Sequence, residues 1–228
     1  MKRSSRLLVA ALTVAATVIL SGAGPALAQS FPVAQNCTAV LNTPGPLSVS
    51  MFLIPDGSGT QLANCYAFGG TSTIAVINVT LIDAAGLPAV NVPATDVRLE
   101  EMSSNVFWCS NAWYPPPVHA PNLADMASNA AGQTQFSLSY HGGGWVHGST
   151  FVWVLEASGA WMQIPTPVNV SYNSPDITGD LVVNLSDVGM FAIDFFTGYM
   201  YRSDFNFDGI INLTDLAMLA PNLGVSCP

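Results

Sequence analysis

The chain has 228 residues, of which 50% are hydrophobic and only 8% are charged, and its formal net charge is −9. A surface this acidic repels phosphate groups, which argues against a nucleic-acid partner and favours the binding of cations. Sparse charge with many Gly, Pro, Thr and Val residues is typical of short strands joined by tight turns.

The first 28 residues have the pattern of a secretory signal peptide. Three basic residues precede the uncharged run Leu7–Leu20, and Ala26-Leu27-Ala28 is a small-x-small cleavage site. The run is shorter than the ~20 residues that a membrane-spanning helix needs. We therefore expect residues 1–28 to be removed and the protein to be secreted, extracellular or at the cell surface. The remaining chain has two arginines and all 14 carboxylates, which gives a net charge of −12.

The chain has four cysteines, Cys37, Cys65, Cys109 and Cys227. An even number of cysteines in an exported chain favours disulfide bonds, and four cysteines allow three pairings. We prefer the pairing of Cys37 with Cys65, because these two are the closest in sequence. No cysteine spacing resembles a zinc site.

Residues 29–172 are predicted to form a β-sandwich domain. After an irregular lead-in, about seven short runs are alternating or rich in β-branched residues, and no convincing helix separates them. Gly, Pro, Asn and Asp residues between the runs indicate turns. The clearest expected strands are Leu47–Ile54, Thr71–Asp83, Val97–Met102, Gln133–Tyr140, Phe151–Glu156 and Pro167–Tyr172.

Two turn motifs in this region resemble the bacterial immunoglobulin-like domains of the invasin type. In Val79–Ala94, a strand leads into a D-x-x-G-x-P turn that starts at Asp83, and a return strand follows. The N-x-x-G-x-x-x-F pattern of a later hairpin is present at Asn129–Phe136. The resemblance implies an immunoglobulin-like fold, and we expect the poorly matching insert Trp108–Met126 to be a loop.

Between Asp204 and Asp215, oxygen-bearing side chains recur at the spacing of a calcium-binding loop. Calcium takes six to eight oxygen ligands, which alternate residues of a tight loop can direct to one centre. Gly209 at position 6 allows the sharp bend, and the apolar Ile211 at position 8 would pair with a second loop in a short ribbon. The expected ligands are the side chains of Asp204, Asn206, Asp208, Asn212 and Asp215 and the carbonyl of Ile210.

A second copy of this loop starts 28 residues earlier. Thr178 at position 3 is a weaker ligand than Asn or Asp, and Leu181 replaces Gly at position 6, so a residue with a side chain must make the bend at some strain cost. We therefore expect two Ca²⁺ ions, with the second site stronger than the first. The expected ligands are the side chains of Asp176, Thr178, Asp180, Asn184 and Asp187 and the carbonyl of Val182.

Each loop is followed by apolar residues at helical spacing, and Gly198 and Gly224 are expected to end the two helices. Loop-helix repeats with Asp at position 12 and no preceding helix resemble a type I dockerin over Asp176–Gly224. The resemblance implies a calcium-binding module at residues 173–228 that docks to cohesin domains of extracellular proteins, often in assemblies for polysaccharide breakdown. In that family the partner contacts come from positions 10 and 11, which are Leu185, Ser186, Leu213 and Thr214 here.

The sequence favours a protein that is not an enzyme. Adjacent strand residues point to opposite faces, so Glu100 and Glu101 cannot flank one glycosidic bond. No nucleophile motif is present. His141 and His147 flank three glycines, a pattern that is more typical of a hairpin end than of a metal site.

Two alternatives to docking stay open. The calcium module can pack on its own β-domain and act only as a structural, calcium-stiffened part of a surface protein. The β-domain can instead bind carbohydrate, as an accessory to polysaccharide hydrolysis, if its aromatic side chains form an exposed stacking platform. The aromatic residues considered for that platform are Trp108, Trp113, Tyr114, Trp145, Trp153 and Trp161.

Overall fold

The computed structural model describes residues 30–45, 48–101, 105–109 and 122–228. The expected signal peptide lies outside the described residues, as do Leu47 and most of the insert Trp108–Met126. Within the described parts, no helix has both the length and the apolar character to cross a membrane.

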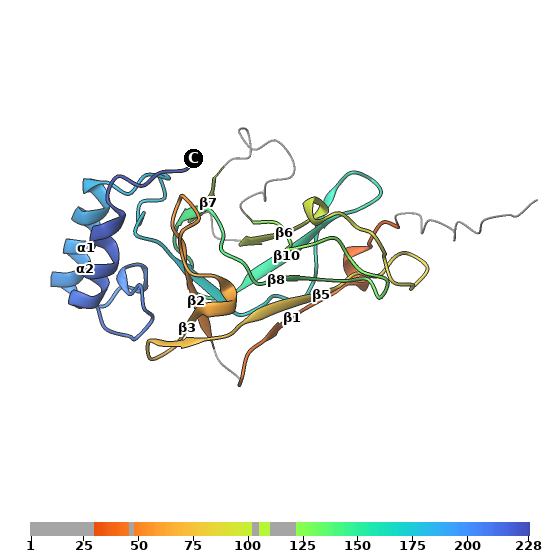
Figure 1. The fold of residues 1–228 in the computed structure, drawn as a ribbon, viewed down its shortest axis with the longest axis horizontal. Helices are drawn as coiled ribbons and strands as arrows, with labels where there is room; N and C mark the ends of the chain where they lie inside the picture. The colour runs from red at the N-terminus through yellow and green to blue at the C-terminus, as the bar shows by residue number, and fades with distance from the viewer. Residues whose placement is uncertain (1–29, 46–47, 102–104, 110–121) are drawn as a thin grey trace, which may run out of the picture.

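The described part of the chain is rich in β-strands and ends in two short α-helices, as the sequence predicts (Figure 1). The strands are β1 (Thr38–Asn42), β2 (Val49–Phe52), β3 (Cys65–Ala67), β4 (Thr71–Thr73), β5 (Val76–Thr80), β6 (Val97–Glu101), β7 (Val106–Trp108), β8 (Gln133–Phe136), β9 (Gly142–Gly144), β10 (Thr150–Leu155), β11 (Trp161–Gln163) and β12 (Val170–Asn173). The helices are α1 (Leu185–Thr197) and α2 (Leu213–Leu219), with short 3₁₀ turns η1 (Ala34–Asn36), η2 (Leu62–Asn64), η3 (Ala94–Asp96), η5 (Tyr201–Ser203) and η6 (Ala220–Asn222).

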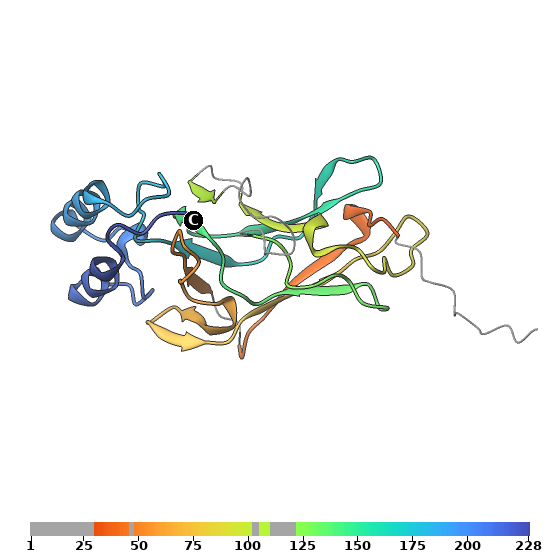
Figure 2. The ribbon, with the colours of Figure 1, turned by 45° about the horizontal axis from the view of Figure 1, so that its top comes forward.

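The strands form four small sheets. Two are antiparallel and three-stranded, with the orders β1-β5-β8 and β11-β10-β6. The third has the order β12-β2-β3-β4, in which β12 and β2 run parallel, and the fourth is the antiparallel pair β7-β9. Figure 2 shows the two helices at the end of the molecule where β2, β3 and β9 lie. We refer to the sheets and their connections, residues 30–172, as the β-part.

Alternating burial explains the outer strands but not the central one. In β10, Val152 and Val154 are buried while the residues between them are half-buried, so one face packs on the core. All four residues of β2 are buried, because β2 lies between β12 and β3 and both of its faces are covered. The period-two alternation expected for Leu47–Ile54 is therefore wrong: Ser50 is as buried as its apolar neighbours.

The hydrophobic core has two parts, and the second crosses the expected domain boundary. The larger cluster lies between the sheets and contains Phe136 and Tyr172. The smaller cluster combines Phe52 and Ile54 of the β-part with Phe191, Phe205 and Leu219 of the C-terminal module. The Phe52 and Phe205 rings are 5.5 Å apart between centroids. Residues 173–228 therefore share a core with the β-part.

The disulfide bond joins Cys109 to Cys227, which corrects the expected pairing of Cys37 with Cys65. Cys37 and Cys65 are separate buried thiols, and burial raises the pKa of the Cys65 thiol to about 11. Proximity in sequence was the wrong criterion, because the fold brings two residues 118 positions apart to a Cα separation of 5.7 Å. The bond ties the C-terminal end of the chain to the residue that follows β7.

Removing this disulfide is expected to destabilise the protein strongly. A cross-link that closes a loop of this length lowers the entropy of the unfolded chain, so the double variant Cys109→Ser with Cys227→Ser is expected to lose about 4 kcal/mol of unfolding free energy in urea titrations. Non-reducing peptide mapping is the direct control: it is expected to find the peptides of Cys109 and Cys227 linked. A linked pair of Cys37 and Cys65 would contradict the fold.

Candidate calcium-binding loops

The first loop curls around the carboxylate of Asp176. Its Oδ1 accepts the backbone N–H groups of Gly179 at 2.9 Å and Asp180 at 3.2 Å, and its Oδ2 accepts that of Leu181 at 2.8 Å. Carboxylate oxygens of Asp176, Asp180 and Asp187 all lie within 4.8 Å of one another. Three of the expected ligands therefore converge on one point, as the spacing predicts.

The last ligand of the first loop also begins the helix. Asp187 Oδ1 accepts the backbone N–H of Thr178 at 2.9 Å, and Asp187 Oδ2 accepts that of Asn184 at 2.8 Å. Asn184 Oδ1 accepts the backbone N–H of Ser186 at 2.7 Å, which completes a capping box at the start of α1. Asn184 Nδ2 donates to Asp180 Oδ2 and to the carbonyl of Val182, so the expected ligands at positions 5, 7 and 9 meet here.

The second loop repeats this arrangement. Asp204 accepts backbone N–H groups from Asp208 at 3.0 Å and Gly209 at 2.9 Å. Asp215 accepts those of Phe205 at 2.8 Å and Asn212 at 2.9 Å, and Asn212 caps α2 as Asn184 caps α1. The sequence repeat is therefore a repeat of backbone geometry. The remaining expected ligands of this loop are Asn206, whose Nδ2 donates to Asp208 Oδ2 at 2.9 Å, and the carbonyl of the exposed Ile210.

Both loops need left-handed backbone at positions 4 and 6, and each supplies one glycine. Leu181 at position 6 of the first loop has a φ of 68°, which confirms the expected strain, and Gly179 at position 4 has a φ of 74°. In the second loop the order is reversed: Phe207 at position 4 has a φ of 57° and Gly209 a φ of 87°. Strain is thus present in both loops, and the difference in ligand chemistry that remains is at position 3.

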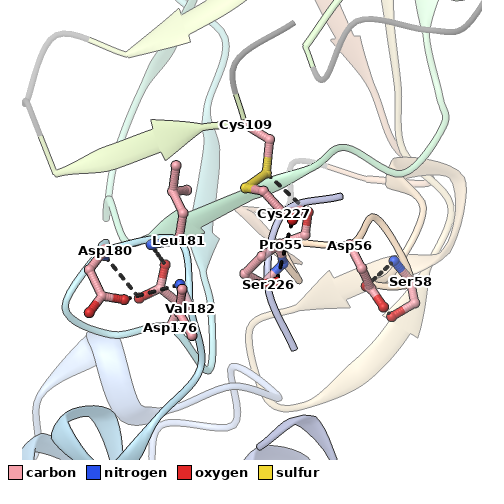
Figure 3. The surroundings of a disulfide bond; sticks show 10 residues. All are labelled: Pro55, Asp56, Ser58, Cys109, Asp176, Asp180, Leu181, Val182, Ser226 and Cys227. Atoms are coloured by element: carbon pink, nitrogen blue, oxygen red, sulfur yellow. Dashed lines mark hydrogen bonds between the residues drawn. A yellow bond between two sulfur atoms is a disulfide. The ribbon is translucent and has the colours of Figure 1, made fainter. Parts of the chain in front are cut away.

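The expected ribbon between the two loops is not formed within the described residues. Position 8 of the first loop, Val183, pairs instead with the C-terminal tail: Val183 donates to the carbonyl of Val225 and accepts from Gly224, both at 2.8 Å. Cys227 donates to the carbonyl of Leu181 at 3.2 Å, so the disulfide lies beside this loop (Figure 3). Apart from Cys227, nothing in the tail sequence indicated this pairing.

Four carboxylates in the loops are buried without a basic partner. Asp176, Asp187, Asp204 and Asp215 are buried, while the two ion pairs of the described residues are Arg98–Glu100 and Arg202–Asp194. Burial raises the pKa of Asp176 to about 6, and Asp187 and Asp180 raise it further, while burial raises the pKa of Asp215 to about 6. Buried negative charge surrounded by oxygen ligands fits a hard divalent cation such as Ca²⁺.

The residues expected to contact a partner are exposed. Leu185 and Leu213 have 80% and 71% of their surface exposed, and Ser186 and Thr214 beside them are exposed as well. The acidic side chains within α1 and α2 are all buried, so neither helix presents a charged side chain to solvent. Between the helices lies a shallow apolar hollow lined by Val188, Phe191, Ala192, Phe195, Phe196, Leu213 and Leu216.

The aromatic and histidine residues of the β-part are engaged in packing. The guanidinium carbon of Arg98 lies 4.0 Å from the ring centroid of Trp161, so it covers a face on which a sugar would stack. Trp108 packs edge-on against Tyr172, and the His147 ring stacks on Tyr201 with 4.4 Å between centroids. Trp113 and Tyr114 lie outside the described residues. No observation here favours a carbohydrate platform.

No family model, curated protein or solved structure matches the chain.

The stability of the metal-free protein and that of the calcium-bound protein are expected to depend on pH with opposite signs. Asp176 and Asp215 have pKa values of about 6 in the fold, above the ordinary 3.8, so the metal-free fold binds more protons than the unfolded chain. It therefore loses stability as pH rises from about 4 to about 6. Calcium binds the ionised carboxylates, so its stabilisation grows over the same range.

Calorimetric melting of metal-free and calcium-saturated protein between pH 4 and pH 7 checks this expectation. The double variant Asp176→Asn with Asp215→Asn is the control, because it removes both groups and is expected to reduce both slopes. Melting temperatures that change with pH in the same direction in both forms would contradict a calcium site at these carboxylates.

The second site is expected to bind calcium more tightly, because the amide of Asn206 is a better ligand at position 3 than the hydroxyl of Thr178. Asp204→Ala is therefore expected to lower the calcium affinity of the full chain more than Asp176→Ala, by about tenfold, in calorimetric titrations. Equal losses, or the reverse order, would show that ligand chemistry at position 3 does not set the ranking.

Proposed function

We propose that this is an exported, non-catalytic protein whose C-terminal module binds two Ca²⁺ ions and docks, in a dockerin-like manner, to a cohesin-like domain of another extracellular protein. The β-part would be an immunoglobulin-like sandwich that carries this module. One observation carries the proposal: in both loops, the exposed residues at positions 10 and 11 lie between a cap residue and a buried ligand, Asn184 and Asp187 in the first loop.

This placement supports calcium-dependent docking. Leu185 and Ser186 are held between Asn184 and Asp187, both expected ligands, so an ion in the loop would fix the backbone directly beneath them. Leu213 and Thr214 stand in the same relation to Asn212 and Asp215. Calcium would thereby order two equivalent contact points at the starts of α1 and α2.

The chemistry of the exposed face suggests the kind of partner domain. The helix surface around the contact points is apolar and uncharged, with Ile193 and Phe196 exposed at 55% and 83%. A partner would therefore present a largely apolar surface and bury this patch on docking. The family has polar or basic residues at the corresponding positions, so the partner would differ from an ordinary cohesin in its contact surface.

A second role, calcium-dependent stiffening of the protein itself, is favoured by the opposite side of the module. The hydroxyls of Ser50 and Tyr201 share a buried hydrogen bond of 2.7 Å, and Phe205 is buried against Phe52. The module thus packs on the β-part through its loops and leaves its helices exposed. Stiffening and docking use different faces, so one calcium-bound structure can serve both.

Docking is tested by adding charge to the contact points. The double variant Ser186→Asp with Thr214→Asp adds one carboxylate at each helix start, and it is expected to weaken capture of purified cohesin domains at least tenfold while both calcium sites remain. Capture is measured on immobilised cohesins with calcium and after chelation, and calcium binding by calorimetry.

The matched control adds the same charge elsewhere. Ser149→Asp with Ser158→Asp changes two exposed residues of the β-part and is expected to leave capture unchanged. Equal capture by the contact-point variant and the wild type would refute this docking face. If no cohesin binds the wild type in calcium, and calcium still raises its melting temperature, stiffening alone is supported.

A further inference from the structure

The three consecutive glycines of β9 have a specific contact with the first calcium loop. A Cβ atom at Gly143 would lie 1.7 Å from Asp176 Oδ2, which is closer than any two such atoms can approach. The neighbouring Gly144 donates its backbone N–H to the carbonyl of Asp176 at 2.7 Å. The glycines of β9 therefore let the backbone of the β-part lie directly against the first ligand of this loop.

A second pair of glycines makes the equivalent contact with the second loop. Gly69 and Gly70, in the turn between β3 and β4, both donate their backbone N–H groups to the carbonyl of Phe207, at 2.9 and 3.2 Å. A Cβ atom at Gly70 would lie 2.9 Å from Cβ of Asp208, the ligand at position 5. The carbonyl of Asp204 in turn accepts a hydrogen bond from Nδ2 of the buried Asn173.

Each loop is thus held by the β-part through its main chain. The carbonyl of the first ligand, Asp176 or Asp204, accepts a hydrogen bond from the β-part in both loops. A glycine turn then excludes any side chain from the space beside a ligand carboxylate or its Cβ. Such contacts matter for metal binding, because outer groups that orient ligands commonly change metal affinity 10–100-fold.

We propose that the β-part acts as an intramolecular receptor for both calcium loops, in which Gly143 and Gly70 are positioning residues for the first and the second site. The inference rests on the proposed calcium sites. It means that the calcium affinity of each loop depends on backbone contacts more than 30 residues away in sequence. By linkage, calcium binding at each loop also stabilises its contact with the β-part.

The test uses the full chain with one loop inactivated at a time. Asp204→Ala leaves only the first site, and Asp176→Ala leaves only the second. Gly143→Ala is expected to weaken calcium binding at least tenfold in the first background and to leave it unchanged in the second. Gly70→Ala is expected to do the reverse. Calcium affinity is measured by calorimetric titration, and the calcium-dependent rise in melting temperature is the second readout.

Gly189→Ala is the matched control, because a Cβ at Gly189 meets no atom within 4 Å and its helical backbone accepts alanine. It is expected to leave both affinities unchanged. The calcium site that each glycine variant should preserve also reports whether that variant folds.

The outcomes separate the inference from the proposed function. If the wild type takes up no calcium, the proposed function fails. If the wild type binds two Ca²⁺ ions and neither glycine variant changes its own site, the loops function independently of the β-part and the inference is overturned. Equal losses at both sites from either variant would also overturn it, because the effect would then not be local.

Discussion

Four carboxylates buried without a basic partner are the constraint on which the C-terminal half of this structure depends. Removing a carboxylate from water is costly, and the chain after residue 28 has only two arginines to offset fourteen acidic groups. The fold responds by surrounding Asp176 and Asp204 with backbone N–H groups and by using Asp187 and Asp215 as helix caps. These bonds orient the carboxylates but leave their charge uncompensated, which is why the arrangement favours a cation.

The same constraint explains why the module has two different sides. The loops, where the charge is buried, lie against the β-part, and aromatic rings such as Phe205 and Phe207 exclude water around them. The helices begin at the loops and extend away from the β-part, with their acidic residues directed inward. What remains outside is apolar and uncharged. An exposed apolar surface on an acidic protein is a cost to solubility unless it binds something.

The sequence predicted the features that depend on neighbouring residues. Ligand spacing located both loops, and an acidic residue three positions after Asn184 and Asn212 located both helix starts, because loop and cap chemistry are local. Contacts between distant segments were not predictable in this way. The triple glycine at Gly142–Gly144 was interpreted as a hairpin end, because its reason is an Asp176 oxygen that lies beside it only in the fold. Cys109 and Cys227 were missed for the same reason.

The supports around each loop bear on which site binds calcium more strongly. The first loop has the poorer ligand at position 3, but it is enclosed by β9, by the C-terminal tail paired with Val183, and by the disulfide at Cys227. The second loop has the better ligand, and it is held by the β3–β4 turn and by Tyr199, whose hydroxyl donates to Asp204 Oδ2 at 2.9 Å. Pre-organisation lowers the entropy that binding must overcome, so it can offset a weak ligand. Affinity is therefore a property of the whole chain, and an isolated fragment of residues 173–228 would lose the supports that distinguish the two sites.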